Sequence, residues 1–270
     1  MPLMAIPLGL LIGLSLGALG GGGSILTVPA LVYGLGQDPP AATTSSLLVV
    51  GASSLIALVP HALAHRVRAV QGLLFGAIGT AGSLAGTTLS SNVPPQVLLT
   101  AFAALMLLVA ALMLRRSRTT PDPASQHDPS TSPLLTLRPH PSCDCPRLAK
   151  VLLTATAVGL LTGFFGVGGG FALVPALALA LGFPIPTAIG TSLLVIALNS
   201  ATALAARLGT GTTQLNWALI GIFTTAAITG SLLGGRLSTR ANPEHLTRAF
   251  ATLLIAVALY TAAHSLPTLL

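Results

Sequence analysis

Long apolar stretches constrain the fold of this chain more than any other feature. Ten such segments follow one another, at about residues 3–19, 24–36, 41–60, 69–90, 96–114, 150–165, 171–182, 187–206, 214–235 and 246–265. Only 6% of the residues are charged, whereas a soluble domain carries about 25%. Apolar helices of roughly 20 residues cross the hydrocarbon core of a bilayer. The sequence therefore predicts an all-α polytopic membrane protein with about eight to ten membrane segments. Its partner along these segments is the lipid bilayer.

A stretch of different composition divides the chain after the fifth apolar segment. It contains seven prolines between Pro121 and Pro146, together with Ser, Thr, Asp, His and basic residues. Such a stretch buries too little apolar surface to offset its ordering entropy, so we expect a flexible linker. The predicted organisation is a first membrane unit at 1–114, a Pro-rich linker at 115–149 and a second membrane unit at 150–270.

The two membrane units repeat each other. Residues 22–50 align with 168–196 without a gap, and 14 of these 29 positions are identical. With a two-residue insertion, 82–103 align with 230–251 at 11 of 22 positions. The informative matches are Gly22/Gly168, Gly23/Gly169, Pro29/Pro175, Gly36/Gly182, Pro40/Pro186 and Ser46/Ser192. We therefore predict two homologous repeats, each with a short Gly-broken helical hairpin and three longer helices. Many transporters are built this way and bind substrate where the repeats meet.

The basic residues predict how the repeats are oriented. The linker region is rich in Arg and Lys, which favours a cytoplasmic location. If each Gly-bearing segment is a hairpin, the loop with Arg66 and Arg68 and the loop with Arg236 and Arg240 also fall inside, and only Arg207 is misplaced. If each Gly run were a kink in one long span, Arg236 and Arg240 would lie outside. Charge therefore favours inverted repeats.

The net charge of +7 is explained by these cytoplasmic loops. No basic amphipathic face or Arg/aromatic interleaving indicates a nucleic-acid partner. The N-terminal segment has no basic residue before its apolar run and no clear cleavage site, so we interpret it as a retained span. Nothing in the sequence specifies a cofactor or an oligomeric state.

Two glycine runs occupy the breaks between short apolar segments. The first is Gly20-Gly-Gly-Gly-Ser24 and the second is Gly166-Val-Gly-Gly-Gly170. Backbone without helical hydrogen bonds is tolerated inside a membrane only where it lines a cavity or is buried in protein. Convergent backbone N–H groups and a helix N-terminus attract anions. The runs predict two halves of one anion site, with helix packing as the alternative role of the glycines. The candidate residues are Gly21, Gly22, Gly23, Ser24, Gly168, Gly169 and Gly170.

Hydroxyl-bearing residues follow each Pro-containing loop. They are Thr44, Ser45 and Ser46 in the first repeat, and Thr191 and Ser192 in the second. We expect them in or near a first helical turn, where they either cap the helix or donate O–H groups to an anion. Asn199 lies about two turns further along and joins the candidate solute-binding set. With Ser53, Ser54 and Ser200 it either extends a polar track or bonds neighbouring helices.

The histidines and the acidic residues limit which proton-transfer groups the membrane segments can contain. His61 and His65 are one helical turn apart and are either interfacial residues or an anion or proton relay. The five acidic residues are expected in loops or in the linker, which argues against a carboxylate proton relay. Cys143 and Cys145 form a C-D-C without a second pair, so neither a disulfide framework nor a metal site is predicted.

At this point the motifs can be compared with a known family. GFFGVGGGFALVPAL, AIGTSLLVI and the paired G-S-L-x-G resemble the TauE/SafE family of sulfite exporters (TSUP) over both repeats, with the linker left out. The first repeat departs from the pattern at Ser24, where the second has Gly170. The resemblance implies a bacterial inner-membrane carrier of small sulfur-containing anions such as sulfite, thiosulfate or organosulfonates.

The expected function is secondary transport of such an anion by alternating access, with the site at the repeat interface. A carrier of a different small solute is the nearest alternative. An intramembrane serine hydrolase that uses Ser24 with His61 or His65 is another, although no G-x-S-x-G surrounds Ser24. A non-transporting membrane scaffold is the third.

Overall fold

The protein is described here by a computed structural model that covers residues 2–90, 93, 95–118, 145–165, 170–208 and 216–265. In chain order these residues form α1 (Pro2–Leu19), α2 (Gly22–Pro29), η1 (Ala30–Gly34), α3 (Pro39–Leu63), α4 (Ala69–Ser90), α5 (Pro95–Arg118), α6 (Cys145–Phe165), α7 (Gly170–Pro175), η3 (Ala176–Ala180), α8 (Ile185–Leu208), α9 (Trp217–Arg240) and α10 (Pro243–Ser265). The two η elements are π-helical turns. No strand occurs in the described residues, and the predicted all-helical class is confirmed.

The helices have the length and the surface of a membrane protein. Five of them, α3, α4, α8, α9 and α10, contain stretches long and apolar enough to cross a bilayer, and shorter apolar stretches lie in α1, α2–η1, α5 and α6. Large apolar side chains are exposed on the outside, among them Leu63 and Leu153, which are 77% and 75% exposed. Such side chains are stable on the surface when lipid rather than water surrounds them.

The same order of elements occurs in both halves of the chain. In each half a long helix, a short helix and a π-helical turn precede three long helices. The π-helical turns begin directly after Pro29 and Pro175, where a proline without an N–H interrupts the regular ladder. Gly36 and Gly182, which end these segments, have φ of +66° and +73°. This correspondence agrees with the duplication inferred from the sequence; the opposite membrane orientation of the halves stays a prediction.

The first Gly run forms the tip of a helical hairpin. Gly20 turns the chain with φ of +69°, and α2 then returns along α1, since Gly23 lies against Ile12 and Leu16 while Gly34 lies against Leu8. In the second half, α7 and η3 pack on α6, and α2 contacts α7. The hairpin arrangement therefore describes the first Gly-bearing segment better than a kink in one long span.

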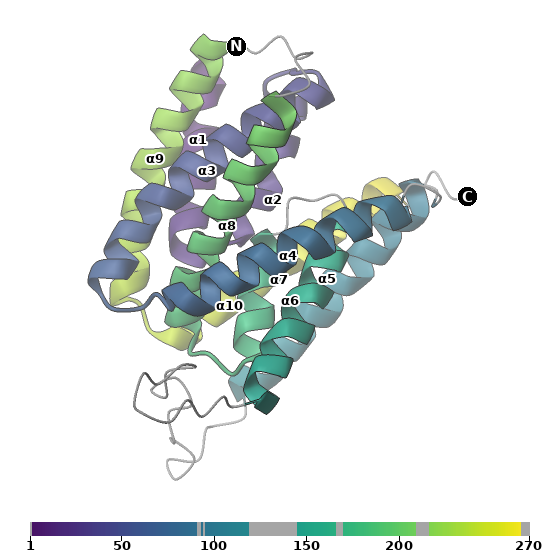
Figure 1. Cartoon of the computed structure of the whole chain (residues 1–270). Coiled ribbons are helices and arrows are strands. Elements are labelled where there is room, and N and C mark those ends of the chain that lie inside the picture. The colour runs from purple at the N-terminus through teal and green to yellow at the C-terminus, as the bar shows by residue number, and fades with distance from the viewer. Residues whose placement is uncertain are drawn as a thin grey trace.

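Glycine faces join helices from different halves of the chain. On α1, Gly9, Gly13 and Gly17 touch the backbone or Cβ of α9, and Gly230 and Gly234 of α9 touch the backbone of α1. On α6, Gly159 and Gly163 touch the backbone of α4 at Gly79 and Ser83. Small residues four apart let parallel helices approach this closely. Figure 1 shows the result: α1, α3, α8 and α9 gather in one part of the molecule, and α4, α5, α6 and α10 in the other.

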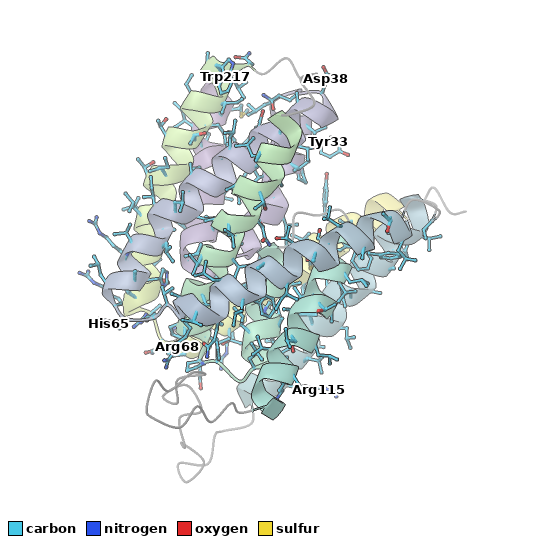
Figure 2. All side chains as sticks on the ribbon, in the orientation of Figure 1. Tyr33, Asp38, His65, Arg68, Arg115 and Trp217 are labelled. Carbon is cyan, nitrogen blue, oxygen red and sulfur yellow. The ribbon has the colours of Figure 1, made fainter. Side chains whose placement is uncertain are left out.

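The two ends of the molecule differ in composition. Trp217, Tyr33 and Asp38 lie at one end, here called the tryptophan end, and His65, Arg68 and Arg115 lie at the opposite arginine end (Figure 2). Two helices extend into the region expected for the linker, 115–149. Helix α5 continues to Arg118, and α6 begins at Cys145. Residues 119–144, with Cys143, lie outside the described residues. The division into two membrane units and a linker stays a prediction.

The glycine contacts generate a stability prediction. A Cβ at Gly13 falls on the backbone of Ala227, whereas a Cβ at Gly221, also on the α1/α9 pair, meets nothing within 4 Å. We expect Gly13→Ala to lower the free energy of unfolding by about 1–3 kcal/mol through overpacking. Gly221→Ala gives the same gain in helix propensity without the clash. The difference between the melting temperatures of the two purified variants therefore measures the cost of overpacking at Gly13. Equal melting temperatures would contradict the close contact.

Candidate functional site

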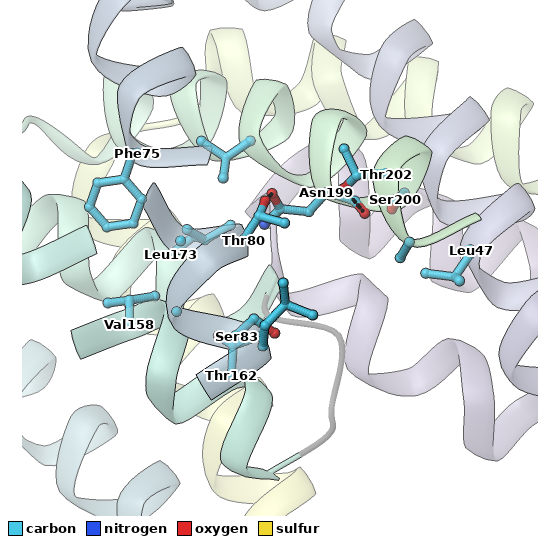
Figure 3. A pocket seen from close by; sticks show the side chains of 15 residues that line it. Leu47, Phe75, Thr80, Ser83, Val158, Thr162, Leu173, Asn199, Ser200 and Thr202 are labelled. Carbon is cyan, nitrogen blue, oxygen red and sulfur yellow. Dashed lines mark hydrogen bonds between the residues drawn. The ribbon is translucent and has the colours of Figure 1, made fainter. Parts of the chain in front are cut away.

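A cavity of about 290 Å³ lies between α4, α6, α7 and α8, with Leu47 of α3 at one edge. Its lining is largely apolar, and it contains no charged side chain. The polar groups that line it are Thr80 and Ser83 of α4, Thr162 of α6, and Asn199, Ser200 and Thr202 of α8 (Figure 3). An apolar cavity with a few converging polar groups has the general character of a small-molecule site.

Asn199 is the most versatile polar group of this cavity. Thr80 Oγ1 lies 3.2 Å from Asn199 Oδ1 and 2.8 Å from the carbonyl oxygen of Gly76. The contact with Thr80 holds one end of the Asn199 amide on the α4 side. The Nδ2 group of Asn199 carries two N–H donors, which suits a solute that presents acceptor oxygens.

The starts of the short helices α2 and α7 meet near α8, whose neighbouring residues line this cavity. Ser24, near the start of α2, faces Gly170 at the start of α7 so closely that a Cβ on Gly170 would fall on Ser24 Oγ. The same Cβ would lie 3.2 Å from Ile196 of α8, the neighbour of the cavity-lining Val195. Ser24 Oγ donates a 2.7 Å hydrogen bond to the carbonyl oxygen of Gly21. Thus Gly21, Ser24 and Gly170 are brought together, as expected for two equivalent breaks in one fold.

The other glycines of the first run have packing roles. A Cβ on Gly22 would meet Leu253 and Phe250 of α10, and a Cβ on Gly23 would meet the α1 backbone. Neither glycine lines the cavity. The alternative role of close helix packing therefore describes Gly22 and Gly23 better than anion binding. Gly168 and Gly169 lie outside the described residues.

The hydroxyls of α3 and α8 do not cap their helices. Because α3 begins at Pro39 and α8 at Ile185, these residues lie in the second turn rather than the first. Ser46 and Ser192 donate to the carbonyl oxygens of Thr43 and Ile189 within their own helices. Thr191 Oγ1 accepts the backbone N–H of Arg68 at 3.1 Å, which ties α8 to the loop before α4. Ser192 Oγ also lies against Gly20 at the hairpin tip.

Several hydroxyls of α3 are buried. Thr44 is 1% exposed and has a bonding partner. Ser45, Ser53 and Ser54 are at most 1% exposed, and their Oγ atoms have no hydrogen-bond partner. A buried hydroxyl without a partner is costly, so these serines require an explanation beyond packing.

The two histidines differ from each other. His61 is fully buried; its Nε2 lies 3.4 Å from the carbonyl oxygen of Gly17 and 3.2 Å from Ser238 Oγ, so it joins α3 to α1 and α9. The expectation that it is interfacial is wrong, because these helices enclose it. His65 follows the end of α3 with φ of +55° and is exposed at the arginine end, beside Arg68 (Figure 2). The two do not form a continuous relay on one helix.

Other features of the sequence analysis can be placed as well. Glu244 lies in the first turn of α10 rather than in a loop, 3.6 Å from Arg248. Among the described residues no three His, Cys, Asp or Glu side chains converge. The hydroxyl of Ser24 donates to Gly21 while His61 contacts Gly17 and Ser238. The serine–histidine pair that a hydrolase requires is therefore not formed by these two residues.

Sequence reasoning missed Thr80, Ser83 and Thr162. Ser83 stands inside the repeated G-S-L-x-G motif, and Gly163 of α6 packs on its backbone. A polar residue within a helix that carries several glycines was a signal that this face meets another helix. The signal does not identify that helix, and the cavity depends on α4 meeting α6 and α8.

Comparisons with known proteins give the family. The family model described as "Sulfite exporter TauE/SafE" matches residues 5–261. A "Probable membrane transporter protein" of Xylella fastidiosa is 35% identical over 96% of this chain and 94% of its own length. "Probable membrane transporter protein YunE" of Bacillus subtilis is 28% identical over 90% and 89% of the two chains, and "Probable membrane transporter protein MJ0441" of Methanocaldococcus jannaschii is 25% identical over 96% of each. No solved structure matches the chain.

The meeting of the hairpin tips generates a second prediction. Because Ser24 Oγ occupies the space next to Gly170, Gly170→Ser alone should overpack the junction and destabilise the protein by about 1–3 kcal/mol. Adding Ser24→Gly exchanges the two residues and removes the overlap. We expect the double variant to regain a large part of the loss, which thermal unfolding of all four proteins measures as a coupling free energy. Additive effects would show that the two tips do not touch.

Proposed function

This chain belongs to the sulfite exporter TauE/SafE family, and we propose that it carries small sulfur-containing anions, such as sulfite, thiosulfate or organosulfonates, across the bacterial inner membrane. The family and the names of its relatives identify a membrane transporter rather than an enzyme. The substrate class is the proposed part.

The single observation that carries the proposal is the lining of the cavity. Its polar groups are neutral hydroxyls and an amide, and no carboxylate among the lining residues would repel an anion. Hydrogen bonds from neutral donors to a charged acceptor are stronger than bonds between neutral groups. A site without a fixed cation binds a sulfur oxyanion weakly enough to release it, as a carrier requires.

The hairpin tips supply the second support for the proposed site. They meet at Ser24 and Gly170, next to α8, whose neighbouring residues line the cavity. We place the anion between Asn199 and this junction, with Gly21, Ser24 and Gly170 as the hairpin contribution. Gly168 and Gly169, the hydroxyls at 44–46 and 191–192, and the histidines stay sequence-based candidates. Transport then proceeds by alternating access, with the halves moving about the site.

Orientation follows from the charges. Arg68 and Arg115 lie at the same end of the molecule (Figure 2), and basic loops favour the cytoplasmic side. We therefore assign the arginine end, and with it the central linker, to the cytoplasm. The start of α8 contacts Arg66 and Arg68 at the arginine end. The cavity-lining residues 195–203 lie from the middle of α8 toward its other end, so we place the cavity on the side away from the arginine end.

The substrate class is tested by thermal stability of the purified protein with sulfite, thiosulfate, sulfate, taurine, sulfoacetate and chloride. A ligand at a hundred times its dissociation constant stabilises the folded state by about 2.7 kcal/mol. We expect one or more sulfur anions to raise the melting temperature and chloride not to do so. Stabilisation by an unrelated solute alone would favour a carrier of that solute.

Asn199 is the residue whose loss should matter most for binding. We expect Asn199→Ala to weaken anion binding about tenfold or more, because a hydrogen bond to a charged group is lost. The matched control is Thr225→Ala, which removes an exposed hydroxyl on α9 that bonds only within its own helix. Titrations of the melting temperature compare the two variants. Equal affinities in both would remove Asn199 from the site.

A further inference from the structure

Two of the three unpartnered serines of α3, Ser53 and Ser54, occupy positions equivalent to the cavity wall of α8. Residues 22–50 align with 168–196 at a constant difference of 146, and the same register pairs Ser53 with Asn199 and Ser54 with Ser200. Asn199 and Ser200 line the cavity, while Ser53 and Ser54 are buried and their hydroxyls lack partners. The same pair of positions is therefore open in one half and closed in the other.

The cavity wall formed by α4 also has an equivalent in the other half of the chain, on α9. In the register that aligns 82–103 with 230–251, Phe75 and Ser83 of α4 correspond to Phe223 and Ser231 of α9. Phe75 and Ser83 line the cavity; the Ser231 side chain is fully buried, whereas Ser83 is only partly buried. Gly17 of α1 packs on Ser231 as Gly163 of α6 packs on Ser83. Thus α1, α3 and α9 repeat the arrangement of α6, α8 and α4, with Ser53, Ser54 and Ser231 buried.

We propose that α1, α3 and α9 form a second solute cavity, closed in this structure, in which Ser53 and Ser54 bind the sulfur-containing anion after it leaves Asn199. This proposal rests on the proposed transport function. It explains why two hydroxyls are buried without partners: they are satisfied when the second cavity opens and a solute with acceptor oxygens enters.

A cluster at the arginine end holds the second cavity closed. His61 of α3 contacts Gly17 of α1 and Ser238 of α9. The guanidinium group of Arg66 donates to the carbonyl oxygens of Ser238 and Thr239, at 3.4 and 3.1 Å, at the C-terminal end of α9. These contacts join α1, α3 and α9, the three helices that the repeat register assigns to the second cavity. Positive charge at a helix C-terminus is favourable, so the Arg66 contact stabilises this closed arrangement. We call His61, Arg66 and Ser238 together the latch.

The latch residues lie on the same faces of α3 and α9 as the serines of the second cavity, about two helical turns closer to the arginine end. Ser54 and His61 are seven residues apart on α3, and Ser231 and Ser238 are seven apart on α9, so each pair shares one face of its helix at a separation of about 10 Å. Opening toward the arginine end therefore requires the latch to separate first. An anion in the second cavity would leave on the side opposite to the first cavity.

Accessibility of single cysteines tests this directly. In a background of Cys143→Ser and Cys145→Ser, the variants Ser54→Cys and Asn199→Cys are exposed to a membrane-impermeant maleimide in right-side-out and inside-out vesicles. We expect the two cysteines to react from opposite faces of the membrane. Adding Arg66→Ala should speed the labelling of Ser54→Cys about tenfold or more, since charge-assisted hydrogen bonds are lost, and should slow that of Asn199→Cys.

A matched control lies two residues away. Arg68 contacts Thr191 through its backbone N–H, which Arg68→Ala retains, so this variant removes the same charge from the same loop and should leave both labelling rates unchanged. Ser238→Ala provides a second variant, which removes the contact with His61 and a hydrogen bond within α9 to the carbonyl oxygen of Gly235, and should speed Ser54→Cys labelling several-fold. Ser238→Ala replaces Arg66→Ala in the labelling experiment if Arg66→Ala lowers the yield of folded protein.

Two results would overturn the proposal: labelling of Ser54→Cys from the same face as Asn199→Cys, or no acceleration by either latch variant. The labelling contains no solute, so it is independent of the substrate. If labelling behaves as expected but no sulfur anion binds or crosses the membrane, the proposed function fails and the second cavity stands. If the anion is transported while Ser54→Cys never reacts, the second cavity fails and the function stands.

Discussion

Direct backbone contact between glycine faces is the interaction on which the rest of the structure depends. It joins α1 to α9 and α4 to α6, each pair with one helix from either half of the chain. In lipid there is no hydrophobic force between helices, so close van der Waals contact of this kind drives association. The halves are therefore interleaved rather than placed side by side. The starts of α2 and α7, one from each half, also meet, at Ser24 and Gly170.

If the solute is the proposed anion, the cavity illustrates how such a fold can bind a charged group. Burial of an isolated ion is costly, yet a fixed buried counter-ion would hold the solute too firmly for release. Thr80, Thr162 and Asn199 offer an intermediate solution, with neutral dipoles aimed into an apolar space. Arg66 is consistent with this arrangement, since its guanidinium bonds the end of α9 instead of lining the cavity.

The sequence predicted much of the fold and part of the site. Hydropathy located every long helix, and the glycine run that begins at Gly20 predicted the short hairpin, because glycine interrupts a helix for local reasons. Lateral contacts were not predictable, since the partner of a glycine face lies elsewhere in the chain. For that reason the sequence left Gly22 and Gly23 open between anion binding and helix packing, and His61 open between an interfacial and a relay role, while it gave no indication of Thr80 and Thr162. Asn199 was a candidate because it lies about two turns beyond the hydroxyls of α8, in a polar track of the same helix.

The exchange of partners between the halves also has a consequence for how the protein is made. Gly13 and its contact Ala227 are 214 positions apart in the sequence. At about 5–20 residues per second during synthesis, α1 reaches the membrane long before α9 exists. Helix α1, which is inserted before α9, is thus packed on this partner only once α9 is present. Until then its glycine face must be held by the insertion machinery, by lipid or by a temporary neighbour, so the final docking of α9 is the step that commits the chain to its native arrangement.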